Sequence, residues 1–157
     1  DVIDYAAREE FAVLNAVATA EGAIQVAMEE LATTLSGRKI LILGAGRIAK
    51  VLIDALSGFH TRITVAARKC SDLAWARVYG CESVPIGGMD CLPGDFDIIF
   101  NTVPAVILDE KRLKMLRPGC LVIDLASKPG GVDFETAGML GVKTWKGSSR
   151  NVGRSDC

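Results

Sequence analysis

Short apolar segments alternate with helical patterns through the middle of the chain. Such nearly all-apolar strands are typical of parallel sheets covered on both faces, and the intervening helices supply right-handed crossover connections. The expected strands are residues 39–43, 62–66, 83–84, 97–101, 120–124 and 142–145. The expected helices are residues 47–56, 71–79, 109–115 and 133–140, and a loop rich in Gly and Pro is expected at 85–94. The chain is therefore predicted to be an α/β domain with one parallel sheet.

A glycine motif, Gly44-x-Gly46-x-x-Ala49, joins the first strand to the first of these helices. Gly44 permits a tight turn, Gly46 lets a pyrophosphate approach the backbone, and Ala49 lets the helix pack closely on the strand. The N–H groups of Arg47 and Ile48, at the positive end of the helix, would bind the phosphates. The motif predicts a dinucleotide site in a Rossmann-type, doubly wound parallel sheet; the alternative is a tight turn in another α/β domain.

The end of the second strand bears on which dinucleotide binds. NAD sites usually place Asp or Glu there to bind the ribose hydroxyls, but this strand ends Ala67-Arg68-Lys69, without an acid. Arg68 can instead bind a 2′-phosphate, with Lys69 and Ser71 as further donors. Ser71 is also expected to cap the next helix. The pattern favours NADP over NAD, and the alternative is a solvated basic loop.

Polar residues lie at the ends of the fourth and fifth expected strands, at the carboxyl edge where ligands bind in such sheets. Cofactor contacts are expected at Asn101, Thr102, Val103, Pro104, Leu125 and Ala126, unless the first four form an ordinary turn. Substrate contacts are expected at Ser127, Lys128, Gly130 and Gly131. Lys128 and Asp124 are the candidate acid–base groups. Asp124 is equally compatible with a structural role as an acceptor of backbone N–H groups.

A long amphipathic helix is expected to precede the sheet, from residue 8 to residue 35. Its apolar residues recur at steps of three and four: Phe11, Leu14, Val17, Ile24, Met28 and Leu31. Ser36-Gly37 is expected to end it. The chain is thus divided into a helix of the interdomain type that packs on the sheet (1–37), a dinucleotide-binding domain (38–145) and a disordered tail (146–157). The chain begins without a methionine, and an upstream domain is expected.

Composition argues against several other classes of protein. A formal net charge of −1 gives no electrostatic basis for binding nucleic acid or an anionic membrane, and no apolar run is expected to span a bilayer. The five cysteines form no C-x-x-C pair and His60 is the only histidine, which argues against a zinc site and a disulfide framework. Reduced thiols in a cytoplasmic protein, with no bound metal, are expected.

Four stretches resemble the A subunits of dipicolinate synthase. They are residues 8–15 (REEFAVLN), 19–24 (TAEGAI), 98–105 (IIFNTVPA) and 123–131 (IDLASKPGG). The resemblance covers roughly residues 4–144 and implies the C-terminal, NAD(P)-binding domain of a two-subunit enzyme. That enzyme oxidises dihydrodipicolinate, a dicarboxylate, to dipicolinate in spore-forming bacteria, and its other component is the dipicolinate synthase B subunit. In related two-domain dehydrogenases the long helix lines the cleft, so the resemblance places Asn15, Thr19 and Glu21 toward the substrate.

The interpretation is therefore an NADP-binding domain serving hydride transfer in dipicolinate synthesis, inactive as an isolated fragment. A homo-oligomer is compatible with the sequence. One rival is a similar domain of a dehydrogenase acting on a 2-hydroxy acid or a shikimate-like substrate. The other is a nucleotide-binding or subunit-docking module without turnover.

Overall fold

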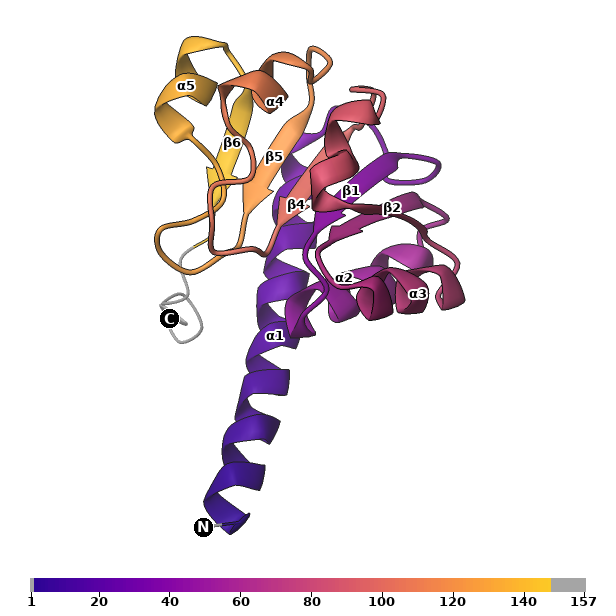
Figure 1. Cartoon of the computed structure of the whole chain (residues 1–157), viewed down its shortest axis with the longest axis vertical. Coiled ribbons are helices and arrows are strands. Elements are labelled where there is room, and N and C mark those ends of the chain that lie inside the picture. The colour runs from indigo at the N-terminus through magenta and orange to yellow at the C-terminus, as the bar shows by residue number, and fades with distance from the viewer. Residues whose placement is uncertain (1, 148–157) are drawn as a thin grey trace.

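The computed structural model describes residues 2–147 and contains one six-stranded sheet (Figure 1). The strands are β1 (Lys39–Leu43), β2 (Arg62–Ala67), β3 (Glu82–Pro85), β4 (Ile98–Asn101), β5 (Leu121–Asp124) and β6 (Lys143–Lys146). All neighbouring strands pair in parallel, in the order β3-β2-β1-β4-β5-β6. This order reverses direction between β1 and β4, as in the Rossmann fold. The predicted doubly wound sheet is confirmed.

Helices cover both faces of this sheet. They are α1 (Val2–Glu30), α2 (Arg47–Ser57), α3 (Cys70–Val78), the 3₁₀ helix η1 (Ile86–Cys91), α4 (Glu110–Lys114) and α5 (Phe134–Met139). Ile40 and Ile42 of β1 belong to the core formed with α1, α2 and α3. Leu41 and Leu43 belong to the core formed with η1, α4 and α5. Because successive side chains point to opposite faces, burial of both faces explains why this strand is apolar throughout.

Helix α1 begins and ends earlier than predicted. It runs from Val2 to Glu30, whereas the predicted helix runs from residue 8 to residue 35. The β-branched residues Thr33 and Thr34, which have low helix propensity, follow this end. Leu35 is buried in the core although it lies outside the helix. The regular spacing of apolar residues therefore placed the predicted C-terminal end of the helix about one turn beyond its actual end.

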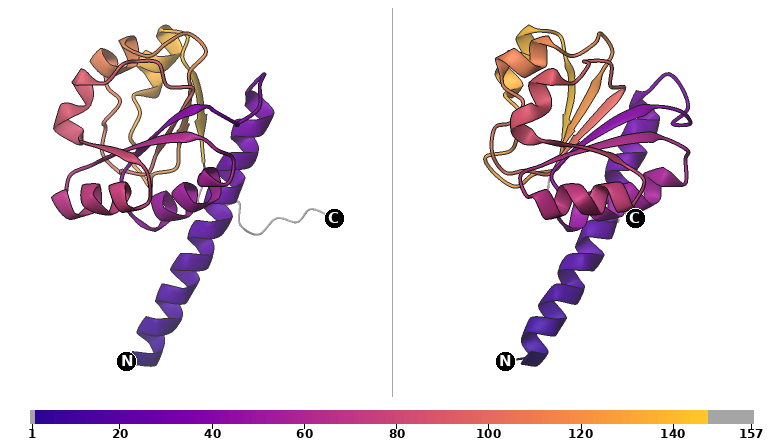
Figure 2. Two further views of the ribbon diagram at one scale, coloured as in Figure 1. Left: turned by 90° about the vertical axis from the view of Figure 1, so that its right-hand side faces the viewer. Right: turned by 45° about the vertical axis from the view of Figure 1, so that its right-hand side comes forward.

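The C-terminal half of α1 packs on the domain, and the N-terminal half projects beyond it (Figure 2). Four small residues face the packed side: Ala16, Ala20, Ala23 and Ala27 are all buried. On the projecting half, Tyr5 and Phe11 are 75% and 74% exposed.

Helix α1 also meets a membrane-span criterion of length and composition. Its segment Asp4–Glu30 is long and apolar enough to cross a membrane, and 28% of its most apolar part is buried in the domain. The expectation that no apolar run is long enough is therefore wrong on length and composition. The buried alanines account for part of that apolar character, and packed helices of soluble proteins pass the same test.

Three smaller predictions are corrected. Ser71 does not cap α3, because the helix already begins at Cys70 and its N-cap residue is Lys69, with no side-chain cap. The expected loop at 85–94 contains η1. Lys146, assigned to the tail, is the last residue of β6; the predicted tail from residue 148 onward lies outside the described residues. Elsewhere the predicted elements are present, with ends shifted by a residue or two.

Candidate functional site

The loop after β1 is shaped by two glycines with different surroundings. Gly44 has φ +104°, and a Cβ there would overlap the hydroxyl of Thr102. The Oγ1 and N–H of Thr102 both donate to the carbonyl of Leu43, at 2.7 and 2.9 Å. Gly44 must therefore be glycine for conformational and steric reasons. The Thr102 hydroxyl therefore holds the loop in place and uses its hydrogen-bond donor within the protein.

Gly46, in contrast, borders open space. A Cβ at Gly46 would meet no atom within 4 Å, and its φ of −80° suits any residue. It occupies the N-cap position of α2 without any side-chain cap, and the first turn of α2 holds no acidic residue. Ala49 is fully buried, as its predicted role requires. The N–H groups at Arg47 and Ile48 are thus left for an anion at the helix N-terminus.

The side chain of Arg47 reaches back to helix α1. Its Nε donates to Glu9 Oε1 at 2.9 Å, and its Nη2 makes a second, short contact to Glu9 Oε2. The hydrogen bond with Arg47 lowers the pKa of Glu9, and the same bond raises the pKa of Arg47. The guanidinium is therefore engaged by a carboxylate, although the backbone N–H of Arg47 stays available.

The end of β2 lies beside the glycine loop. Leu43 pairs with Ala66, and Gly44 N–H donates to the Ala66 carbonyl at 2.8 Å. Ala67 is buried, and the next two residues, Arg68 and Lys69, are exposed. Among the described residues no carboxylate forms an ion pair with either of these cations. Ser71, also exposed, lies in the first turn of α3.

A buried polar pair joins the ends of β4 and β5. Asn101 and Asp124 are both 0% exposed. Asn101 Nδ2 donates to Asp124 Oδ1 at 2.9 Å and to the carbonyl of Val103 at 3.0 Å, while Val103 N–H donates to Asn101 Oδ1 at 3.2 Å. Asp124 also accepts from the N–H groups of Ala126 at 3.2 Å and Gly131 at 3.0 Å. Asn101 and Asp124 thus fix the loops that follow both strands.

The contacts around this pair show which polar groups of four predicted site residues are already bound within the protein. Asp124 corresponds to the structural alternative, because a fully buried carboxylate with three donors does not face a substrate. Asn101 uses its side chain within the protein. The N–H groups of Gly130 and Gly131 are already bound by Ser127 O and Asp124, so they are not free for substrate. A Cβ at Gly131 would overlap the Asn101 amide, and one at Gly130 would lie 2.7 Å from Asp124 Oδ2. Close packing explains both glycines.

The other predicted substrate residues differ in exposure and in whether their side chains are hydrogen-bonded within the protein. Ser127 and Lys128 are exposed at the tip of the loop. On α1, Glu21 is exposed, whereas the Thr19 hydroxyl donates to the carbonyl of Asn15 at 2.8 Å within the helix. Among the described residues, no hydrogen bond joins these helix residues to the Ser127–Lys128 tip. A substrate role for this set remains a prediction.

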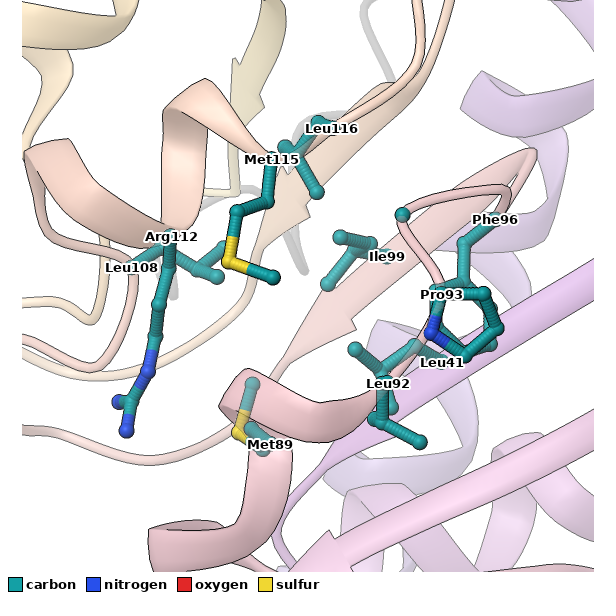
Figure 3. A pocket seen from close by; sticks show the side chains of 11 residues that line it. Leu41, Met89, Leu92, Pro93, Phe96, Ile99, Leu108, Arg112, Met115 and Leu116 are labelled. Carbon is teal, nitrogen blue, oxygen red and sulfur yellow. The ribbon is translucent and has the colours of Figure 1, made fainter.

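A small cavity lies away from this edge, between η1, β4 and α4 (Figure 3). Its lining is mostly apolar, with Leu41, Met89 and Ile99 among the residues that face it, and its volume is about 30 Å³. That is room for about one water molecule, so it cannot hold a nucleotide.

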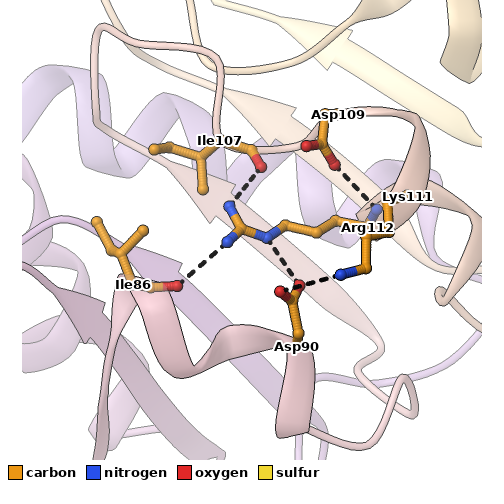
Figure 4. A network of polar contacts seen from close by, with 6 residues as sticks. All are labelled: Ile86, Asp90, Ile107, Asp109, Lys111 and Arg112. Atoms are coloured by element: carbon orange, nitrogen blue, oxygen red, sulfur yellow. Dashed lines mark hydrogen bonds and ion pairs between the residues drawn. The ribbon is translucent and has the colours of Figure 1, made fainter.

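Arg112 links the elements around this cavity (Figure 4). It donates to Asp90 Oδ1 at 3.1 Å and to the carbonyls of Ile107 at 2.9 Å and Ile86 at 3.3 Å. The hydrogen bond from Arg112 lowers the pKa of Asp90. No local pattern pairs residues 22 positions apart, so sequence reasoning missed this contact. The partners of Arg112 are internal, and the contact is therefore a structural one.

The described cysteines and acidic residues form no metal site. The free thiols are exposed at Cys70 and Cys91 and buried at Cys81 and Cys120. Within residues 2–147, no three His, Cys, Asp or Glu side chains are grouped to hold a metal ion.

Comparison with known proteins assigns the chain to a family. The NAD-binding domain of D-isomer specific 2-hydroxyacid dehydrogenases matches residues 7–130. The A subunit of dipicolinate synthase from Bacillus subtilis is 32% identical over 87% of this chain and 46% of its own length. A shikimate dehydrogenase (NADP(+)) of Halorhodospira halophila is 33% identical over 58% of this chain and 35% of its own.

Solved structures agree with this assignment. The crystal structure of the dipicolinate synthase A subunit from Bacillus halodurans superposes with a TM-score of 0.84 at 32% identity, over 88% of this chain and 48% of that one. The chain thus spans about half the length, or less, of the relatives it matches. The predicted resemblance to the dipicolinate synthase A subunit is confirmed, and the chain belongs to the family of D-isomer specific 2-hydroxyacid dehydrogenase NAD-binding domains.

Proposed function

We propose that this chain binds NADP and presents its nicotinamide for hydride transfer. The observation that carries the proposal is the open space at Gly46, beside an uncapped N-terminus of α2. On the neighbouring strand end, Arg68 and Lys69 are exposed and form no ion pair within residues 2–147. The N-terminus of α2 suits a pyrophosphate, and the two cations suit a second phosphate on the same ligand. The residues present therefore fit the dinucleotide expected of this family.

The cofactor-binding groups divide into three parts. The pyrophosphate binds the backbone from Gly46 to Ile48. The 2′-phosphate binds Arg68, Lys69 and Ser71. The nicotinamide half lies against residues 102–104 and 125–126, where Val103 is fixed by Asn101 and Ala126 by Asp124. When bound, the cofactor accepts the hydride; the protein binds it and orients it.

The proposed substrate is dihydrodipicolinate, oxidised to dipicolinate, and the proposed partner is a B subunit. Support comes from the similarity to the dipicolinate synthase A subunit over 87% of the chain. Lys128, exposed on the loop after β5, supplies a cation for one substrate carboxylate. Aromatisation of the ring favours the oxidation. This activity belongs to the complete enzyme, in the cytoplasm of a spore-forming cell.

The pyrophosphate site is tested by Gly46→Ala. Because an added methyl group meets no protein atom, the domain should still fold, and the thermal unfolding midpoint should fall only slightly, as expected for Ala in place of Gly at an N-cap. The methyl group would occupy the side from which phosphate approaches, so the Kd for NADP should rise on the order of tenfold. Gly138→Ala is the control for binding, since a Cβ there also meets nothing and the residue lies in α5; Ala inside this helix should slightly raise the unfolding midpoint and leave the Kd unchanged. Equal affinity in both variants would refute this placement.

The choice of NADP is tested by Arg68→Ala. Loss of charge-assisted hydrogen bonds to a 2′-phosphate should weaken NADP binding by roughly 10- to 100-fold and leave NAD binding nearly unchanged. An equal effect on both dinucleotides would remove the 2′-phosphate argument. In the complete enzyme, Lys128→Ala should raise the KM for dihydrodipicolinate; an unchanged KM would count against the substrate assignment.

A second candidate is the corresponding domain of a shikimate-type dehydrogenase. It is favoured by the 33% identity to the NADP-dependent shikimate enzyme, over a smaller share of this chain. Turnover of shikimate, without turnover of dihydrodipicolinate, would establish it instead.

A further inference from the structure

The ion pair between Glu9 and Arg47 connects two parts of the molecule with different roles. Arg47 is the first residue of α2, next to Gly46, and Glu9 lies on the projecting half of α1. Both oxygens of Glu9 bind the guanidinium, and the two side chains remain about half exposed. A carboxylate 38 residues away in the chain is therefore held at the N-terminus of α2, where the phosphates of the dinucleotide are expected.

Glu9 and a pyrophosphate would compete for the same positive groups. The first turn of α2 has no acidic residue of its own, so Glu9 brings a negative charge to this helix end. A guanidinium binds phosphate in the same two-pronged manner as it binds a carboxylate. If a phosphate takes Arg47, Glu9 loses its partner and faces a like charge, which is unfavourable.

The same pair also fastens the projecting half of α1. Among the described residues, α1 forms two ion pairs with the rest of the chain: Glu9 with Arg47, and Glu30 with Lys143. The second lies at the C-terminal end of α1, where Lys143 Nζ also donates to the Glu30 carbonyl at 3.2 Å. Loss of the first pair would thus loosen the N-terminal half alone.

We propose that Glu9 competes with the dinucleotide phosphates for Arg47, so that cofactor binding releases the projecting half of α1 from the glycine loop. This inference rests on the proposed dinucleotide site and adds to it a regulation of that site. It makes Glu9 a residue that lowers cofactor affinity and couples cofactor occupancy to the helix.

The test compares Glu9→Gln with Glu30→Gln. Both changes remove one carboxylate charge from α1, but the second lies away from the glycine loop. Calorimetric titration with NADP at low salt should show a Kd lowered about two- to fivefold in Glu9→Gln, the scale of an exposed ion pair, and unchanged in Glu30→Gln. In an Arg47→Ala background, Glu9→Gln should have a smaller effect, because the competed guanidinium is gone and only the repulsion between Glu9 and the phosphates remains.

Hydrogen exchange measures the release of the helix. In the wild type, saturating NADP should speed amide exchange in residues 4–14, whereas in Glu9→Gln exchange should be fast already and unresponsive to NADP. Intact NADP binding with equal Kd values in wild type and Glu9→Gln would overturn this inference alone. Absence of NADP binding by the wild type would instead overturn the proposed function and this inference with it.

Discussion

The Asp124 carboxylate should be one of the costliest side chains to remove. In Asp124→Ala, the N–H groups of Ala126 and Gly131 lose their acceptor, and Asn101 Nδ2 keeps only the Val103 carbonyl. Each buried N–H left without an acceptor costs about 1–3 kcal/mol. Two such groups give a loss of about 4 kcal/mol, a large part of the roughly 5–15 kcal/mol that stabilises a typical domain.

For a chain of this size, about 4 kcal/mol corresponds to a fall of roughly 8–16 °C in the unfolding midpoint. Thermal unfolding followed by circular dichroism measures it. Asp95→Ala is the control, since Asp95 forms an exposed ion pair with Lys39, and its midpoint should match the wild type. If Asp124→Ala does not fold, Asp124→Asn, which keeps one acceptor oxygen, should show an intermediate loss. A midpoint within about 2 °C of wild type in both Asp124 variants would refute the reasoning.

Three further predictions concern separate parts of the fold. Gly44→Ala should lower stability by about 1–3 kcal/mol and weaken NADP binding, because φ is +104° there; denaturant unfolding and calorimetry would check both. At pH 8 iodoacetamide should label Cys91, which is exposed, but not Cys120, because burial raises its thiol pKa to about 12; equal labelling in native protein would contradict this. The hydrogen bond from Thr136 lowers the pKa of Asp133, so this cap stabilises α5 above the ordinary carboxyl pKa of 3.8 and less as pH falls below it. The midpoint difference between wild type and Asp133→Ala should therefore be constant above about pH 4 and shrink in more acid solution.

Local sequence pattern is sufficient to predict the sheet and the glycine loop. Apolar runs buried on both faces, separated by helices, allow few arrangements, so the parallel order follows from alternation. The roles of Gly46 and Ala49 also depend on short-range geometry within one strand–turn–helix unit. These parts need no knowledge of distant contacts.

Sequence pattern is less informative where residues far apart in the chain meet. Asp124 ends β5 and Gly131 lies in the loop after it, a position that predicts substrate-facing groups. Asp124 instead accepts from Asn101, at the end of β4, and from the N–H of Gly131. No local pattern pairs Glu9 with Arg47, which is 38 residues away. The predicted end of α1 is wrong because the prediction followed the spacing of the apolar residues, whereas the low helix propensity of Thr33 and Thr34 favours an earlier end.

The central claim is a dinucleotide site that prefers NADP, and calorimetric titration of the chain with NADP and NAD at one salt concentration tests it most directly. The account predicts that both bind and that NADP binds more tightly, by roughly 10- to 100-fold, because Arg68 reaches the 2′-phosphate. Tighter binding of NAD would contradict the role of Arg68, and no binding of either would contradict the site itself.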